Sequence, residues 1–133
     1  MTHYIRLHGP WECWPPEGDP VRLAFPVSLP TIPFDPLPPT IRLIRRFGRP
    51  SNLTSDTRVV LEWTNGCLSA TVRLESDPTA PRTAAPHEAV LWNLPSPLPW
   101  RNALIVQIDL AASCDSQSIT GDLVTECRLG VGG

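Results

Sequence analysis

Tryptophan is the residue type in this sequence that most suggests binding chemistry, because five occur among 133 residues. An indole ring offers a broad, flat apolar surface on which the C–H face of a sugar ring can stack. Trp14 precedes Pro15, and Trp100 lies in the segment PSPLPWRN, so both fall outside the predicted strands. These two are the predicted exposed platforms. The alternative for each is a tryptophan that clamps a proline onto the fold.

A single stacked indole is too weak a binding site on its own. Covering ~60 Å² of sugar at roughly 25 cal/mol per Å² gives about 1.5 kcal/mol, whereas millimolar binding needs about 4 kcal/mol. Two platforms with charged hydrogen bonds reach weak affinity. The predicted ligand-binding residues are therefore Trp14 and Trp100 together with Arg101, Glu75 and His87.

The other three tryptophans are predicted to fill the core. Trp11, Trp63 and Trp92 alternate with polar neighbours, and indole rings are mostly buried in ordinary domains.

Catalytic motifs are not found in the sequence. None of the three histidines belongs to H-E-x-x-H, and no serine lies in G-x-S-x-G. A glycosidase needs two carboxyl groups ~5–9.5 Å apart, and a chain with thirteen acids contains candidate pairs by chance. These pairs are Glu75 with Asp77, and Asp109 with Asp115. The sequence therefore predicts a protein that is not an enzyme.

Metal and cofactor sites are not predicted either. The four cysteines, at positions 13, 67, 114 and 127, form no C-x-x-C pair, and no histidine stands at zinc-ligand spacing from them. Cys114 and Cys127 face each other if the segment between them folds back as a hairpin. The two cysteines could form a disulfide or remain a reduced, buried pair. The reduced pair is favoured because no export signal is visible. For the same reason the expected location is the cytoplasm.

Charge and hydropathy exclude two classes of partner. The formal net charge of −2 argues against nucleic acid, whose binders carry a cationic excess. No apolar run approaches the ~18 residues of a membrane span. The basic cluster Arg42, Arg45, Arg46 and Arg49 divides between two faces, because strand alternation puts Arg42 and Arg46 opposite Arg45. It is predicted to be a solvated surface.

The elements that must position these residues are strands, since 17 prolines leave little uninterrupted sequence for helices. A proline-rich strap covers residues 15–39, and a polar, proline-broken loop without strand or helix covers 75–87. The predicted strands are 2–8, 21–25, 40–47, 57–64, 67–74, 88–94, 102–110 and 121–131. They predict one all-β domain over residues 1–133, an antiparallel two-sheet β-sandwich of jelly-roll type with about eight strands and minimal helix.

Alternation within the strands predicts which side chains face inward. These are Ile5 and Leu7 in the first strand, Leu68, Ala70, Val72 and Leu74 in 67–74, and Leu104, Val106, Ile108 and Leu110 in 102–110. Asn65-Gly66 is a strong signal for a tight hairpin turn. It predicts that strands 57–64 and 67–74 are antiparallel neighbours.

The order of several motifs resembles the amino-terminal, galactose-binding-like jelly roll of family-two glycoside hydrolases, the β-galactosidase and β-glucuronidase group. The resemblance spans nearly the whole chain, through LHGPW (7–11), IRLIRRFGRP (41–50), TRVVLEWTNGCLSATVRL (57–74) and RNALIVQIDLA (101–111). Within these segments, Gly9 with Trp11 and Phe47 with Pro50 match motifs of the family, as do Asn102, Leu104 and Val106 in the last strand.

The resemblance implies a sugar-binding domain on its own, because the catalytic barrel of those enzymes has no counterpart in this chain. The sequence departs from the family where an Asn-Gly turn helps to shape the sugar pocket: here Glu75-Ser76 and a proline-rich insertion stand in its place. We expect a non-catalytic module that binds a carbohydrate weakly. The alternative is a protein-interaction or scaffold sandwich, with a protein partner or a second copy of itself. A small hydrolase is the third hypothesis.

Overall fold

The computed structural model describes residues 3–25, 27–28, 31–34, 38–51, 53–54, 56–75, 81–94, 98–110 and 122–132. Within these residues the chain forms ten β-strands and no α-helix. The same residues contain no helix of the length and hydropathy that crossing a membrane requires. The all-β fold predicted from the prolines is confirmed, with two strands more than the eight expected.

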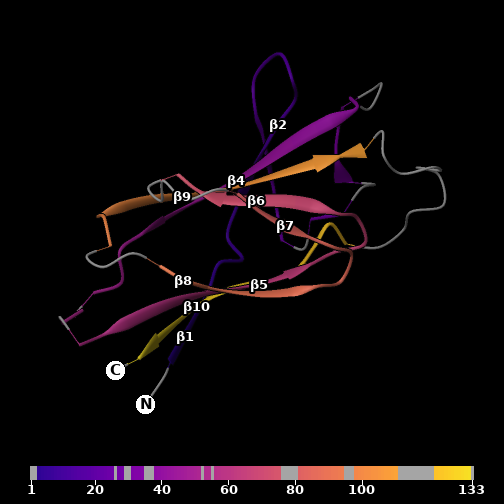
Figure 1. Ribbon diagram of the computed structural model, residues 1–133. Helices are drawn as coiled ribbons and strands as arrows, with labels where there is room; N and C mark the ends of the chain where they lie inside the picture. The colour runs from indigo at the N-terminus through magenta and orange to yellow at the C-terminus, as the bar shows by residue number, and fades with distance from the viewer. Residues whose placement is uncertain are drawn as a thin grey trace.

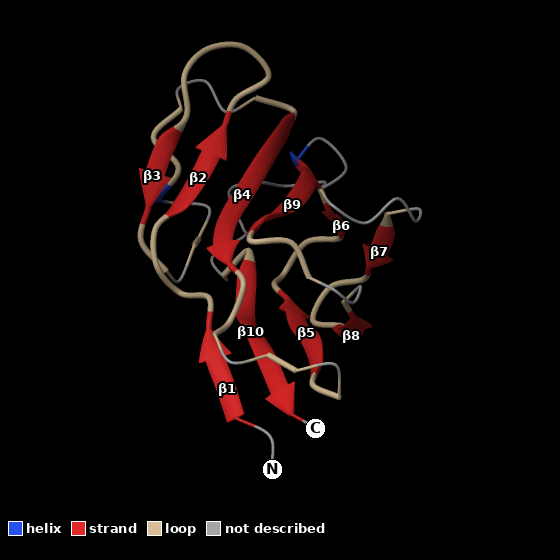
Figure 2. Ribbon diagram, turned by 90° about the vertical axis from the view of Figure 1, so that its left-hand side faces the viewer, coloured by secondary structure: helices blue, strands red, loops and turns tan. Residues whose placement is uncertain are grey.

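The strands form two antiparallel sheets packed face to face as a sandwich (Figure 1). The four-stranded sheet has the order β1 (His3–Arg6), β10 (Val124–Gly132), β5 (Arg58–Asn65), β8 (Ala89–Asn93). The six-stranded sheet has the order β3 (Val21–Leu23), β2 (Trp11–Trp14), β4 (Thr40–Gly48), β9 (Arg101–Asp109), β6 (Ala70–Leu74), β7 (Arg82–Ala84). In Figure 2, β1 lies beside β10 and the two termini lie at the same end of the molecule.

The core between the sheets is filled by every second side chain, as the alternation predicts. Leu104, Val106 and Ile108 of β9 are fully buried. Trp11 of β2 and Trp63 of β5 meet across the two sheets with ring centroids 5.9 Å apart. The predicted burial of Trp11, Trp63 and Trp92 is confirmed, since each exposes 3% or less of its surface.

Two strands were not expected from the sequence. β2 occupies Trp11–Trp14, beyond the end of the predicted strand 2–8. β7 occupies Arg82–Ala84, so the prediction that 75–87 contains no strand is wrong. β7 is three residues long and pairs only with β6 at the sheet edge, and an edge strand tolerates nearby prolines because its outer N–H groups need no partner.

The predicted burial of Ile5 is also wrong. All four residues of β1 are exposed, and Ile5 keeps 36% of its surface accessible. Ile5 is opposite the buried Leu129 of β10, but β1 is the edge strand of its sheet. Leu7, two residues further along, is buried as predicted.

The predicted Asn65-Gly66 hairpin does not form. β5 and β6, which flank this pair, belong to different sheets, so the two residues carry the chain across the sandwich. The Asn65 side-chain amide donates to the carbonyl oxygens of Leu68, Ala84 and Ala85 at 2.7, 3.1 and 3.0 Å. Tertiary hydrogen bonds of this buried side chain therefore override the local turn preference.

Candidate functional site

The outer face of the six-stranded sheet carries the side chains that alternate with the core positions. In β4 the inner side chains are Ile41, Leu43 and Phe47, and the outer ones include Arg42 and Arg46. Arg45 falls on the inner side, so the predicted division of the basic cluster between two faces is confirmed. The register aligns Arg46 with Ala103 of β9 and Gly48 with Arg101.

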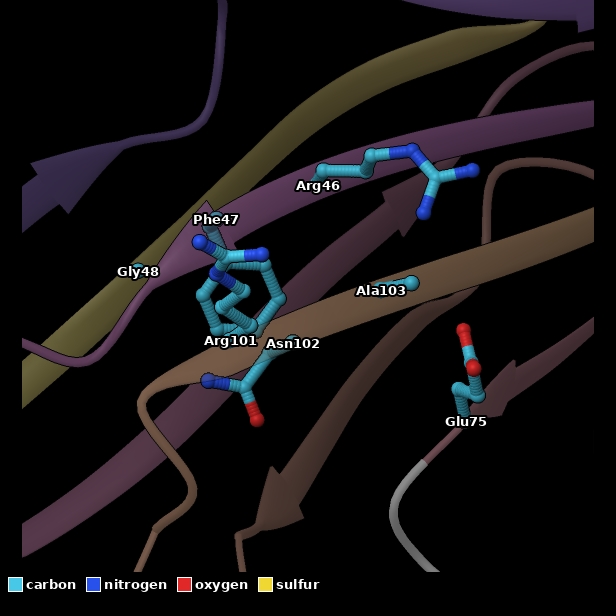
Figure 3. Close-up of a pocket in the computed structure, with 7 residues that line it drawn as sticks. All are labelled: Arg46, Phe47, Gly48, Glu75, Arg101, Asn102 and Ala103. Atoms are coloured by element: carbon cyan, nitrogen blue, oxygen red, sulfur yellow. The ribbon is translucent and has the colours of Figure 1, made fainter.

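A pocket of about 540 Å³ opens at the end of this face where β4, β9 and β6 meet. Ala103 and Gly48 have little or no side chain, which leaves a hollow between the longer Arg46, Arg101 and Glu75 (Figure 3). The buried Phe47 and Asn102 complete its lining.

The position of Glu75 in the pocket follows from the pairing of β6 with β9. Leu74 is opposite Leu104, and the backbone N–H of Glu75 donates to the carbonyl oxygen of Ala103 at 2.9 Å. Figure 3 shows Arg46 and Glu75 on opposite sides of Ala103. The pocket therefore places a carboxylate across from a guanidinium, with a space between them.

The charged side chains of the pocket differ in whether they form ion pairs. Arg46 Nε lies 2.7 Å from Glu12 Oε2 of the neighbouring strand β2. Among the described residues, no ion pair engages Arg101 or Glu75. Both side chains are exposed, so an acceptor and a donor group are open to a ligand there.

Trp100 lies beside the pocket, immediately before Arg101. It exposes 76% of its surface, as predicted for a platform. Its backbone oxygen accepts a 3.0 Å hydrogen bond from the N–H of Arg49, whose guanidinium carbon lies 4.9 Å from the centre of the indole ring. The side-chain amide of Asn102 donates to Pro99 at 2.9 Å and fixes the same corner.

Trp14 lies at the other end of β4, paired with Arg42. Its indole is half-buried, and Nε1 donates to Glu12 Oε1 at 3.2 Å. It lines a separate hollow of about 450 Å³ that also includes Pro15 and Pro16. The two predicted platforms therefore do not form one groove. Trp14 shares its hollow with Pro15 and Pro16, and Trp100 lies beside the other pocket.

His87 is not brought into the pocket. It lies in the turn before β8 with a backbone φ of 61°, a left-handed conformation in which histidine is more frequent than most residues. Its backbone N–H donates to the carbonyl oxygen of Gly66 at 2.8 Å. This contact places it beside the crossing between the sheets, while Glu75 and Arg101 share the pocket.

Arg46 was not among the predicted binding residues. The alternation of β4 placed it correctly on the outer face, and the basic cluster was interpreted as solvated surface. What the sequence did not reveal was the partner strand: only the pairing of β4 with β9 puts Ala103 beside Arg46. The small side chain at that position was the available signal.

Metal-binding chemistry has no support in the described residues, which contain no group of three or more metal-ligand side chains. Cys13 and Cys127 are buried free thiols. Burial raises the pKa of Cys13 to about 11 and also raises that of Cys127, so neither is a ready nucleophile. Cys114, the predicted neighbour of Cys127, lies outside the described residues.

Comparison with known proteins identifies the fold. No protein-family model and no curated protein matches the chain. The FMN-binding β-glucuronidase of Faecalibacterium prausnitzii L2-6 matches with a TM-score of 0.72 and 19% identity, over 98% of this chain and 22% of its own. The β-glucuronidase of Bacteroides uniformis matches with a TM-score of 0.71 and 14% identity, over 98% of this chain and 18% of its own.

A family-two β-galacturonidase of Eisenbergiella tayi, bound to galacturonate, matches with a TM-score of 0.70 and 15% identity. The match covers 98% of this chain and 24% of the enzyme. The chain thus spans less than a third of the length of the enzymes it matches. Its fold is that of the β-sandwich domain of family-two glycoside hydrolases, the β-glucuronidase and β-galactosidase group, as the sequence resemblance predicts.

Proposed function

We propose that this chain is a non-catalytic carbohydrate-binding module whose sugar site is the pocket between Arg46, Glu75 and Arg101. The observation that carries the proposal is the meeting of Glu75 and Arg101, both unengaged by ion pairs within the described part of the chain, in a hollow of about 540 Å³. A volume of this size accommodates a small ligand.

The chemistry of the pocket suits a polyhydroxylated ring. The Glu75 carboxylate accepts hydrogen bonds from hydroxyl groups, and the guanidinium groups of Arg46 and Arg101 donate to hydroxyl or carboxylate oxygens. Trp100 lies at the rim with most of its surface accessible and supplies an apolar face. The fold that this chain shares with glucuronidases and a galacturonidase also supports a sugar as the ligand.

A binding role without hydrolysis agrees with the acidic groups of the pocket. Both routes of glycoside hydrolysis use two carboxyl groups, and Glu75 is the one carboxylate among the described residues that line the pocket. The nearby Glu12 accepts hydrogen bonds from Trp14 and Arg46. The fold match covers only a minor part of the glycosidases.

Calorimetric titration with galactose, glucose, galacturonate and glucuronate tests this function. We expect millimolar binding of at least one sugar, weakened about tenfold or more by Arg101→Ala and by Glu75→Gln, since a charged hydrogen bond contributes roughly 1.5–3 kcal/mol. Arg58→Ala is the matched control, because Arg58 is an exposed arginine of the four-stranded sheet. Absence of heat with all four sugars at millimolar concentration contradicts the proposal.

A second candidate function, protein interaction, is favoured by a different surface. Leu91 exposes 65% of its side chain on β8, an edge strand of the four-stranded sheet, and an open strand edge can pair with another chain. Light scattering after size exclusion tests it: a dimer that Leu91→Lys converts to monomer supports this role, and a monomer at all concentrations opposes self-association.

A further inference from the structure

The outer face of the six-stranded sheet has a positive charge excess, although the whole chain has a net charge of −2. Strand alternation and register place the charged side chains on this face. The cations are Arg22, Arg42, Arg46, Arg73 and Arg101, and the anions are Glu12, Glu75 and Asp109. Only Arg46 among these arginines has an ion pair within the described residues. The face is therefore electrostatically complementary to an anion.

Two hollows lie on this face at opposite ends of β4 and β9. The first is the pocket of Arg46, Glu75 and Arg101, and the second is lined by Trp14, Thr40, Arg42 and Gln107 with nearby prolines. Arg42 and Arg46 are four residues apart on one strand, which is about 13 Å at ~3.3 Å per residue. A single sugar ring does not bridge that distance, so one occupant of both hollows must be a chain of sugars.

Glu12 connects the two hollows physically. Its Oε1 accepts the hydrogen bond from Trp14 Nε1 at 3.2 Å, and its Oε2 lies 2.7 Å from Arg46 Nε. One carboxylate thus orients the indole of the second hollow and a guanidinium of the first. The hydrogen bond to Glu12 uses the Nε–H of Arg46. Between the hollows, Ile44 is paired with Ile105 on the outer face; Ile44 is partly exposed, and Ile105 keeps only 8% of its surface accessible.

We propose that this face binds a linear acidic glycan that runs along β4 and β9 and occupies both hollows at once. This inference rests on the proposed function, because it assigns the sugar pocket to one end of a longer site. Anionic groups of the glycan, carboxylate or sulfate, pair with Arg42 at one end and Arg101 at the other. Sugar faces lie on Trp14 and on the partly exposed Ile44, and Glu75 accepts hydroxyl hydrogen bonds.

A nucleic acid fits this face less well than a glycan does. Its phosphates repeat at every nucleotide, and its binders rely on a strong cationic excess. Here Glu12, Glu75 and Asp109 interrupt the arginines. A glycan supplies hydroxyl donors for such carboxylates, and a nucleic acid backbone supplies few.

Dissociation constants for galacturonate and for its tetramer and hexamer test the proposal, with chondroitin sulfate hexasaccharide as the sulfate arm and cellohexaose as the neutral arm. We expect the galacturonate hexamer to bind at least tenfold more tightly than the monosaccharide and the neutral hexamer, with affinity that falls as salt rises. Arg42→Ala should weaken hexamer binding severalfold and leave monosaccharide binding unchanged, and Trp14→Ala should weaken hexamer binding severalfold. Arg101→Ala should weaken both, and Arg58→Ala neither.

Each other outcome has a definite meaning. Equal affinity for monosaccharide and hexamer, or no effect of Arg42→Ala, overturns the extended site and leaves the single pocket standing. Equal affinity for cellohexaose overturns its acidic specificity. Equal affinity for single-stranded DNA overturns the assignment to a glycan. If the protein binds none of the sugars, the monosaccharide included, the proposed function is overturned as well. Arg42 is exposed on the sheet surface, so its variant tests the site even if Trp14→Ala does not fold.

Discussion

At Gly66 and Cys67 the backbone that leaves β5 lies against the backbone that leads into β10, its neighbour in the four-stranded sheet. Gly66 N–H donates to the carbonyl oxygen of Leu123 at 3.1 Å, and Cys67 N–H donates to that of Asp122 at 2.9 Å. This approach is so close that a Cβ on Gly66 would lie 1.9 Å from the oxygen of Asp122. The glycine is needed for space, because no side chain fits between the two backbones.

Gly66→Ala should therefore be strongly destabilising. The atoms that a Cβ meets belong to backbone, which cannot move aside as a flexible side chain can, so we expect a loss of at least about 2–3 kcal/mol in the free energy of unfolding. Urea denaturation followed by tryptophan fluorescence measures it. Gly48→Ala is the control, since the nearest atom to its Cβ is the Trp100 oxygen at 3.8 Å. Similar stability of the two variants would show that the crossing is not closely packed.

Asn65 and Gly66 show where prediction from sequence fails. Asn-Gly favours a hairpin through local backbone preference, and the neighbouring sequence does not indicate the acceptors at Ala84 and Ala85, which are 19 and 20 residues further along the chain. The positions of Glu75 and Arg101 also depend on the tertiary pairing of strands. They were chosen for their chemistry beside a loop and a tryptophan, and strand pairing brought them into one pocket. Their shared location depended on β9 lying between β4 and β6, which alternation alone does not specify.

At the scale of elements, alternation predicted the long central strands well. The inward residues of β9 and β6 are buried as expected, because a strand with neighbours on both sides and a second sheet above it has only one wet face. The predictions failed at the short edge strands. β2 and β7 have four and three residues, too few for a period to be recognised, and β1 is exposed on both faces.

The segment after β1 is attached to β10 by a hydrogen bond between two side chains. His8 Nε2 lies 2.7 Å from Glu126 Oε1, which also accepts the backbone N–H of Cys127 at 3.0 Å. Phe25 stacks on the His8 ring, with centroids 4.1 Å apart. Burial raises the pKa of Glu126, but these hydrogen bonds together with the nearby charges of His8 and Arg6 outweigh it and hold the pKa below its ordinary value of 4.5.

The stability of the protein should depend on Glu126 in the acid range. Because the folded pKa lies below the unfolded one, the stabilisation is complete above about pH 4.5 and is lost as the pH falls through the folded pKa. Glu126→Gln should lower the free energy of unfolding at neutral pH and flatten its decline below that value. Urea denaturation across pH 3–7 checks this, with the exposed Glu17→Gln as control. Parallel pH profiles for wild type and Glu126→Gln would contradict it.

At the scale of the whole molecule, the first strand of the chain pairs with the last strand in the four-stranded sheet. β1 pairs with β10 through four residue pairs, from His3 with Val131 to Arg6 with Arg128. Arg128 lies over the Tyr4 ring at 4.0 Å and pairs with Glu62 of β5. β1 buries little of its own surface, so its main effect is to cover the edge of β10.

Removal of residues 1–6 should therefore leave a folded protein that self-associates. Four cross-strand pairs at roughly 0.2–1 kcal/mol each predict a loss of about 1–4 kcal/mol in the free energy of unfolding. Leu7 stays in place, buried and donating its N–H to the Cys127 oxygen at 2.9 Å, so the core keeps its anchor. The bared edge of β10 is then open to pairing with a second copy. Urea denaturation and light scattering measure the two effects, with removal of residues 1–2, which spares β1, as control. A truncated protein that is unfolded would show that β1 stabilises the core itself, and one that stays monomeric would show that the β10 edge needs no cover.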